Sequence, residues 1–320
     1  MNNTGKIQVK EILEKYPWII EENQNCVISP DADGMLCGLF MSHFFNWKIV
    51  GYYDNGKNLI LQKGLKAEDC IFLDTEIRRP NIKSIGHHIS LFRKQDSEDV
   101  LKGYINCFNP NNLRDRTLKE KFGGKYPMAT IHLLISIVGS VKKIEFSDQS
   151  FFVVLQADGT INRFLDKYSE NLRDWLVYLG AEDNGHVLNK MLDRETTLLK
   201  INREYVDYVQ KFVKTKKDKI PISERGNLTF SSFNKNKDKF SEECAAVMGN
   251  YLNFLSENTG WQYKKDSWLI NDFKLYEFTK KIVTPGVGNY KKALEENFLS
   301  LAITSTLEMN YTIESPNALP

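Results

Sequence analysis

The sequence has few cysteines, and those few are spread too far apart to suggest a shared structural role. Five cysteines occur among 320 residues, without any C-x-x-C pair. An odd and dispersed set of this kind argues against a disulfide framework and against a structural zinc site. We therefore predict a reducing, cytoplasmic setting and small, buried cysteine side chains, of which Cys26 and Cys70 are the clearest examples.

Long apolar runs and an excess of charge of one sign are also missing. No run approaches the ~20 residues that a membrane-spanning helix needs, and the opening stretch "MNNTGKIQVKEILEKYPWII" lacks the basic and apolar segments of a secretion signal. The 43 Lys and Arg residues and 41 Asp and Glu residues give a net charge of +2. We therefore expect no membrane partner and no overall field that would attract nucleic acid.

What the sequence does contain is a series of short apolar runs in its first third. A buried helix is predicted at 34–47, between the first two runs. Strand, helix and strand in succession favour a parallel sheet with right-handed crossovers. The predicted strands are 26–29, 48–54, 70–74, 84–90 and 104–108. The predicted fold class is therefore α/β, with a parallel-sheet N-terminal domain and flanking helices.

The remaining chain predicts more helices and then a smaller α/β region. The first helices are expected at 126–139, at 148–180 with a break near Gly159, and at 187–213. We divide the chain into a first domain at 1–195, a helical and basic linker at 196–225, and a smaller α/β domain at 226–320. That last domain should contain strands at 227–233, 269–279 and 308–314 and helices at 241–257 and 290–302.

A basic stretch lies across the predicted linker. Residues 210–239 hold nine Lys and Arg residues against three Asp and Glu residues. Such a stretch is either a solvated linker or a track for a phosphate backbone. The second interpretation is attractive because Phe212, Phe230 and Phe233 lie within it and offer rings on which bases can stack.

Acidic and imidazole side chains follow several of the predicted strands. Asp31 and Asp33 come just after the first strand, Asp74 closes the third, and His87 and His88 lie in the fourth. Because the carboxyl ends of parallel strands meet at one edge of a sheet, we expect these groups to converge. One aspartate would suffice to cap the following helix, and a second in an apolar setting is costly without a cation. Carboxylate and imidazole together suit Mn²⁺, Mg²⁺, Fe²⁺ or Zn²⁺.

Four short stretches together resemble a known family. "SPDADG", "FLDTE", "GHH" and "QADGT" occur in this order over about residues 25–165. They resemble the four ordered motifs of the DHH phosphoesterase superfamily. That superfamily includes single-strand exonucleases, phosphodiesterases of oligoribonucleotides and cyclic dinucleotides, and the family II pyrophosphatases. The resemblance covers half of the chain.

The resemblance implies a centre for Mn²⁺ or Mg²⁺, with up to two ions. Asp31 would hold the first ion. Asp33, His87 and Asp158 would hold the second. Asp74 would bridge both ions and orient the nucleophilic water, which makes it a catalytic residue as well as a ligand.

Three further residues are predicted to bind the substrate. The resemblance implies that His88 contacts the substrate phosphate and acts in catalysis. Arg78 and Arg79 are either solvated charges or phosphate clamps, a task for which the guanidinium group is suited. His43 and His132 lie on apolar helical faces and are expected to be structural.

The chain departs from the family pattern at two places. Relatives supply another ligand to the first ion two or four residues before the first aspartate, where this chain has Ser29 and Val27. The aspartate that precedes the two histidines in the family is Gly86 here. The first site is therefore reduced to Asp31 and Asp74, and Asp54 is a candidate to compensate.

Three functions remain open on the sequence alone. The first is a metal-dependent phosphodiesterase or nuclease acting on single-stranded nucleic acid, short oligonucleotides or cyclic dinucleotides. The second is a catalytically degenerate relative that serves as a scaffold or binds nucleic acid. The third is a small-molecule pyrophosphohydrolase, against which the basic stretch speaks mildly.

Overall fold

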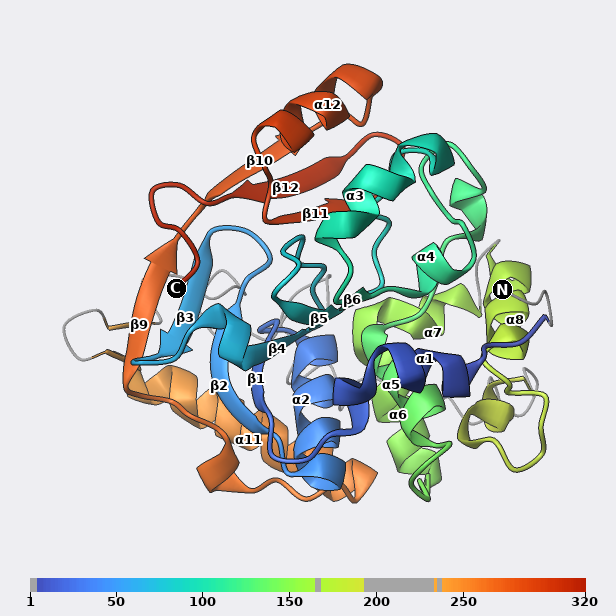
Figure 1. The fold of residues 1–320 in the computed structure, drawn as a ribbon. Helices are drawn as coiled ribbons and strands as arrows, with labels where there is room; N and C mark the ends of the chain where they lie inside the picture. The colour runs from blue at the N-terminus through green and yellow to red at the C-terminus, as the bar shows by residue number, and fades with distance from the viewer. Residues whose placement is uncertain (1–4, 165–167, 193–232, 235–237) are drawn as a thin grey trace.

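A seven-stranded sheet forms the centre of the molecule (Figure 1). The structure is a computed structural model that describes residues 5–164, 168–192, 233–234 and 238–320. The strands follow the order β6-β5-β4-β1-β2-β3-β9; the first five are parallel to one another, and β3 and β9 run antiparallel to their neighbours. The strands are β1 (Asn25–Ile28), β2 (Lys48–Tyr53), β3 (Asn58–Gln62), β4 (Cys70–Leu73), β5 (Lys83–Ile85), β6 (Cys107–Phe108) and β9 (Phe273–Glu277). The α/β prediction is confirmed.

Both faces of this sheet are buried, which is why its strands read as continuous apolar runs. In β1, Cys26 and Ile28 face one hydrophobic cluster, whereas Val27 between them faces another. The same alternation occurs in β4, where Ile71 contributes to the first cluster and Phe72 to the second. Side chains of a strand point alternately to opposite faces, so an unbroken apolar run fills both.

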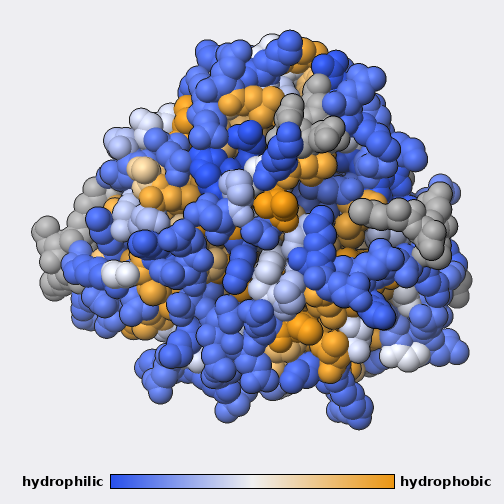
Figure 2. Space-filling view, in the orientation of Figure 1, coloured by the Kyte–Doolittle hydropathy of each residue, from blue (hydrophilic) through white to orange (hydrophobic). Residues whose placement is uncertain are grey.

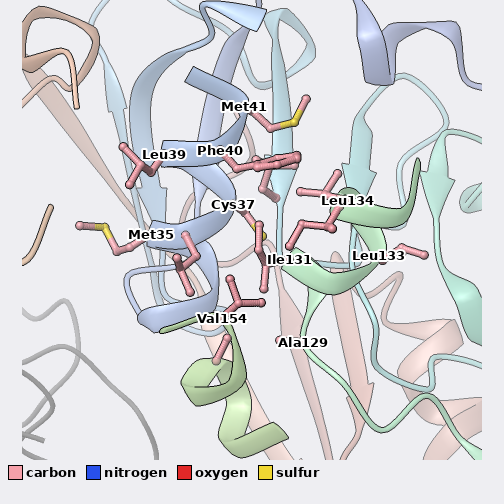
Figure 3. Close-up of a cluster of buried hydrophobic side chains, with 14 of the residues drawn as sticks. Met35, Cys37, Leu39, Phe40, Met41, Ala129, Ile131, Leu133, Leu134 and Val154 are labelled. Carbon is pink, nitrogen blue, oxygen red and sulfur yellow. The ribbon is translucent and has the colours of Figure 1, made fainter. Parts of the chain in front are cut away.

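Four helices pack against one another on the first of these faces. They are α2 (Ala32–Phe45), α5 (Thr130–Val138), α6 (Asp148–Gln156) and α11 (Glu242–Thr259). In Figure 3, Phe40 of α2 lies against Leu134 of α5, and Val154 of α6 closes the cluster below them. Because α2 is buried almost all round, its sequence is apolar on every side. This packing fixes the start of α5 close to the start of α2.

A smaller antiparallel sheet lies beside the large one. Its strands are β10 (Thr279–Val283), β12 (Met309–Ile313) and β11 (Ser300–Ile303), in that order. Helix α12 (Val287–Glu295) and α3 (Ser97–Gly103) supply part of its apolar cluster. Single bridges join Ile77 to Ser300 and Ile89 to Ile303, so this sheet lies over the chain that follows β4 and β5.

The predicted second half agrees with the structure in some places and differs in others. The break near Gly159 is confirmed: α6 is followed by the 3₁₀-helix η5 (Ala157–Gly159), α7 (Thr160–Arg163) and α8 (Ser169–Tyr178). The helix predicted at 290–302 is wrong at its end, because residues from Ser300 form β11. Strand β3 was not predicted. Helix α11 and strand β9 pack with the large sheet, and the separate small sheet begins at Thr279.

Several predictions fall outside the described residues. The helix predicted at 187–213 is described only as the 3₁₀-helix η6 (Val187–Met191). Three further predictions lie outside the described residues. They are the linker at 196–225, most of the basic stretch (including Phe212 and Phe230), and the strand at 227–233 except for its last residue. The remaining elements are α1 (Val9–Lys15), η1 (Pro17–Ile20), η2 (Ala67–Asp69), η3 (Lys94–Asp96), α4 (Pro110–Leu113), η4 (Phe122–Gly124), β7 (Phe233–Asn234), β8 (Lys239–Phe240) and η7 (Lys265–Ser267).

The surface and the cysteines agree with the composition. All five cysteines are buried and carry free thiols. Among the described helices, none has the length and apolar character needed to cross a membrane. On the face shown in Figure 2, hydrophilic residues predominate and apolar residues form separate small areas.

Candidate metal centre

Three neighbouring strands of the large sheet end at one edge, and the chain leaving each one carries a predicted ligand. Strands β5, β4 and β1 are adjacent in the sheet. Asp33 lies in the first turn of α2 after β1, Asp74 follows β4, and His87 follows β5. The predicted convergence is therefore confirmed for these three residues.

A fourth ligand comes from the break between two helices. Asp158 lies in η5 with φ 49°, in the left-handed region that non-glycine residues seldom adopt. Asp74 also has a positive φ, 61°. Such backbone strain concentrates at functional sites, where the surrounding structure holds it in place. The carboxylates of both residues belong to the same group of side chains.

These four side chains form one compact group. One ligand atom from each of Asp33, Asp74, His87 and Asp158 lies within 4.8 Å of the other three. The side chains of Asp33, Asp74 and His87 are 0%, 4% and 9% exposed, whereas that of Asp158 is 33% exposed. The group is thus closed on three sides and open to solvent at Asp158.

Asp33 is fixed by the start of helix α5. Its two carboxylate oxygens accept hydrogen bonds from the backbone N–H groups of Thr130 and Ile131, at 2.6 and 2.9 Å. The helix dipole and these donors favour a negative charge at this point. Burial, and then the nearby carboxylates Asp74 and Asp158, nevertheless raise the pKa of Asp33 well above its usual value. The negative charge in this group is therefore not fully compensated.

Thr130 determines which nitrogen of His87 is free to bind a cation. The Thr130 hydroxyl donates to Asp74 Oδ1 at 2.9 Å, and its oxygen lies 2.8 Å from His87 Nδ1. Because a hydroxyl has one hydrogen, Thr130 must accept a hydrogen bond from Nδ1–H. The lone pair of a neutral His87 then lies on Nε2, which faces Asp158 Oδ2 at 3.0 Å.

This arrangement requires a proton or a metal ion between His87 and Asp158. Two atoms with lone pairs repel each other at 3.0 Å unless a proton or a metal ion lies at that place. Burial lowers the pKa of His87, but hydrogen bonds and charge from Asp158 and Asp74 outweigh it and raise this pKa well above its usual value. Three carboxylates and one imidazole are ligands that a divalent ion prefers. The residues present therefore fit the implied metal.

Asp31 lies outside the group of four. Its Oδ1 caps helix α2 by accepting from the Gly34 N–H at 3.1 Å, and it lies 2.7 Å from the Ser29 hydroxyl. The same hydroxyl lies 2.6 Å from Asp74 Oδ2. A side chain at position 34 would collide with Ser29, because a Cβ there would be 2.1 Å from the Ser29 carbonyl oxygen. The role of Asp31 as ligand to a first ion stays a prediction.

His88 is held by a residue that the sequence analysis did not single out. Its backbone N–H donates to Glu76 Oε1 at 2.6 Å, and its Nδ1 lies 3.4 Å from the same oxygen. A Cβ on Gly86 would be 2.3 Å from Glu76 Oε1. The Glu76 carboxylate thus fills the space that a side chain at position 86 would need. The available signal was that Glu76 belongs to "FLDTE", two residues after Asp74.

The backbone around the two histidines is supported from α4. The Asn111 side chain donates to the His87 carbonyl at 2.7 Å, and Asn109 donates to the His88 carbonyl at 2.7 Å. The His88 ring stacks on the His87 ring, with centroids 4.3 Å apart, and 31% of its side chain is exposed. His88 is therefore accessible to a substrate, while His87 is not.

The two predicted arginines and Asp54 make contacts away from this group. Arg79 donates to the Phe298 carbonyl at 2.9 Å and to Glu314 at 2.6 Å. The Arg78 guanidinium lies 4.9 Å above the Phe298 ring. Asp54 accepts from the backbone of the turn between β2 and β3. These contacts tie elements of the fold together, and a role for either arginine in substrate binding stays a prediction.

Comparisons of the chain with protein-family models, with curated proteins and with solved structures gave no match. The geometry of the group of four and the motifs quoted above therefore carry the functional argument.

Proposed function

We propose that the protein is a divalent-metal-dependent phosphoesterase that hydrolyses phosphodiester bonds in single-stranded nucleic acid or short oligonucleotides. One observation carries this proposal: four ligand atoms from four separate segments lie within 4.8 Å of one another. The resemblance of those same segments to the DHH motifs supplies the reaction class. Cyclic dinucleotides are also proposed as substrates, because they contain the same phosphodiester bonds.

Each residue of the group has a part in the proposed centre. Asp33, Asp74, His87 and Asp158 would hold one Mn²⁺ or Mg²⁺ ion. When bound, such an ion polarises a phosphoryl oxygen and lowers the pKa of water. Thr130 fixes the ring of His87, as an outer partner of a metal ligand commonly does.

His88 is the residue that we expect to contact the substrate phosphate. Its ring is partly exposed, and Glu76 and Asn109 hold its backbone on both sides. An imidazole N–H that is fixed in this way can donate to a phosphoryl oxygen without reorganisation. Its part in catalysis is therefore to contact and orient the phosphate.

A second candidate is a relative that binds nucleic acid without hydrolysing it. Two observations favour it. The Ser29 hydroxyl lies between Asp31 and Asp74, at 2.7 and 2.6 Å, where two carboxylates would otherwise be free to share a first ion. Position 86, which carries an aspartate in the family, has only hydrogen here. We therefore expect one ion per chain.

The test combines metal content with hydrolysis. The purified protein is stripped with a chelator and reloaded with Mn²⁺, and its metal content and its cleavage of labelled oligonucleotides are measured. We expect one ion per chain and cleavage, both abolished in Asp74→Ala. Asp69→Asn is the matched control, since Asp69 lies at the opposite end of strand β4 from Asp74 and outside the group.

The outcomes separate the two candidates. A bound ion without cleavage of any oligonucleotide or cyclic dinucleotide favours the non-hydrolytic relative. Cleavage that is equal in wild type and Asp74→Ala would remove the proposal, because the activity would then not depend on this centre.

A further inference from the structure

A second charged region lies away from the metal centre. It is a cavity of about 500 Å³, between α1, the chain that follows α4, and α8, which lie on one side of the molecule in Figure 1. We propose that this cavity, the basic cavity, binds phosphate groups. Its cationic lining residues are Lys6, Lys15, Arg114, Arg116 and Lys121.

Arg116 is the residue that calls for an anion. Its side chain is 11% exposed, and its Nε has no hydrogen-bond partner among the described residues. Among the described residues, the carboxylate that Arg116 approaches is that of Asp174, which lies 3.9 Å from Nη2. Asp174 is already engaged by Arg114, whose Nη1 and Nη2 donate to its two oxygens at 2.8 and 3.2 Å. Two guanidinium groups thus share one carboxylate, and a nearly buried positive charge is left over.

Both guanidinium groups are held in place before any ligand arrives. Arg114 lies 4.5 Å from the Trp175 ring centroid and 4.8 Å from that of Tyr178. Arg116 lies against the turn of η4, where a Cβ on Gly124 would be 3.3 Å from its Cζ. A guanidinium that is already fixed loses little entropy on binding, and its planar fork matches two oxygens of a phosphate.

The remaining charges of the basic cavity are positive in sum. Two carboxylates, Glu11 and Asp115, also line it, but Asp115 is paired with Lys94 at 2.6 Å. Five cations and two carboxylates line the cavity. Lys6 is paired with Asp183 and Arg114 with Asp174, so counting these partners and Lys94 leaves a surplus of two positive charges. The volume is within the range of about 300–1,000 Å³ that small-ligand sites have. A polyanionic ligand with one or more phosphates is therefore the class that fits.

The basic cavity is distinct from the metal centre, although one residue supports both. The Arg116 N–H donates to the Asn111 carbonyl at 2.9 Å, and the Asn111 side chain donates to the His87 carbonyl at 2.7 Å. No residue of the group of four lines the cavity. Binding there is thus open to measurement without a metal ion and without hydrolysis, and it does not depend on the proposed function.

The test uses the full chain in the presence of a chelator, so that the metal centre does not contribute. Binding of a fluorescein-labelled twelve-residue oligothymidylate is followed by polarisation, and binding of inorganic phosphate and pyrophosphate by calorimetry. The variants are Arg116→Gln, Lys15→Gln and Lys121→Gln. Lys10→Gln is the matched control, because Lys10 lies on the same helix as Lys15 but outside the cavity, with its side chain 91% exposed.

We expect Arg116→Gln to weaken binding about tenfold or more, since a charge-assisted hydrogen bond is lost. Lys15→Gln and Lys121→Gln should weaken it less, and Lys10→Gln should bind within about twofold of wild type. Saturation by inorganic phosphate or pyrophosphate identifies a small phosphate compound as the ligand, whereas binding of the oligonucleotide alone identifies a nucleic-acid strand. Either result supports the proposal when the cavity variants weaken that binding and Lys10→Gln does not, whereas binding that none of the cavity variants weakens would overturn it.

Two other results would overturn it. One is the absence of binding of all three probes by the wild type at 50 mM and 150 mM salt. The other is equal loss of binding in Lys10→Gln and in the two lysine variants of the cavity, which would show general surface charge rather than a site. Lys15→Gln and Lys121→Gln keep the test valid if Arg116→Gln does not fold.

Discussion

The metal centre and the basic cavity each contain charge that their own side chains do not compensate, and the sign of this charge differs between the two. In the metal centre, three carboxylates and one imidazole crowd within 4.8 Å, so negative charge is left over. In the basic cavity, Arg114 and Arg116 share the single carboxylate of Asp174, so positive charge is left over. Burial makes an unbalanced charge costly in both places. Each imbalance therefore indicates a ligand of the opposite sign, a divalent cation in one and a phosphate in the other.

The two regions differ in how the chain builds them. The metal centre lies where adjacent parallel strands end, a place that topology alone makes convergent. The basic cavity is formed by α1, the chain after α4 and α8, which no sheet aligns. The first region could therefore be predicted from the sequence, whereas the second could not.

The largest effect that we expect is loss of the metal centre in Asp74→Ala. Its carboxylate contacts both Thr130 and Ser29 and is one of the four ligands. Outer partners of a metal site are worth about 10–100-fold in affinity, so removal of a ligand should cost about 100-fold or more. Calorimetry with Mn²⁺ measures this.

The same variant sharpens the comparison between the two regions. Oligonucleotide binding by Asp74→Ala under chelating conditions should equal that of wild type, because Asp74 does not line the basic cavity. Mn²⁺ affinity that is unchanged in this variant would show that the ion binds elsewhere.

A second, smaller effect is expected from Thr130→Val. The substitution removes the hydroxyl that accepts from His87 Nδ1 and donates to Asp74. We expect Mn²⁺ affinity to fall about 10–100-fold, while Thr130→Ser, which keeps the hydroxyl, stays close to wild type. If valine and serine variants bind Mn²⁺ equally well, the ring of His87 is not oriented in this way.

The space filled by Glu76 predicts a third effect. Gly86→Ala places a Cβ 2.3 Å from Glu76 Oε1 in a buried setting. We expect the free energy of unfolding to fall by about 1–3 kcal/mol, the usual cost of overpacking. Gly123→Ala is the control, since nothing lies within 4 Å of a Cβ there. Equal stability of the two variants in urea titrations would mean that Glu76 does not occupy this space.

The smallest effect concerns two buried imidazoles with opposite surroundings. His87 has carboxylate neighbours, whereas His132, fully buried in α5, has no partner for Nε2 among the described residues. Burial lowers the pKa of His132 from 6.5 to about 4. An unfolded chain then binds a proton below pH 6.5 that the folded chain refuses, so stability is full above that pH and is lost as the pH falls toward 4.

Between pH 7.5 and pH 5.5 this loss should amount to about 1.3 kcal/mol. It is isolated as the difference between wild type and His132→Leu, because all other titrating groups are common to both proteins. Urea unfolding at the two pH values measures it. Identical pH dependence of the two proteins would contradict the neutral, buried state of His132.

The sequence predicted those elements whose local pattern of apolar residues fits only one kind of secondary structure. Strands β1 and β4 are buried on both faces, so their apolar runs were unambiguous. The helix predicted at 290–302 extends into strand β11 because the apolar pattern continues past the end of α12 at Glu295. A run of this length fits either element until its partner strand is known, and that partner, β12, lies further along the chain.

The residues of the candidate site were likewise predicted only in part. Asp33, Asp74, His87 and Asp158 were predicted together, because motifs and strand ends placed them. Glu76 was not predicted. Its carboxylate occupies space that is open only because Gly86, on the other side of a loop, has no side chain. The Arg114–Asp174 pair was missed as well, because its members are sixty positions apart and belong to no repeating pattern.

The most direct test of the metal centre is an anomalous-scattering map from crystals of the protein grown with Mn²⁺. We predict one strong manganese peak bonded to Asp33, Asp74, His87 and Asp158, and its loss in crystals of Asp74→Ala. Full manganese occupancy at other residues, or no peak among these four at saturating Mn²⁺, would contradict it.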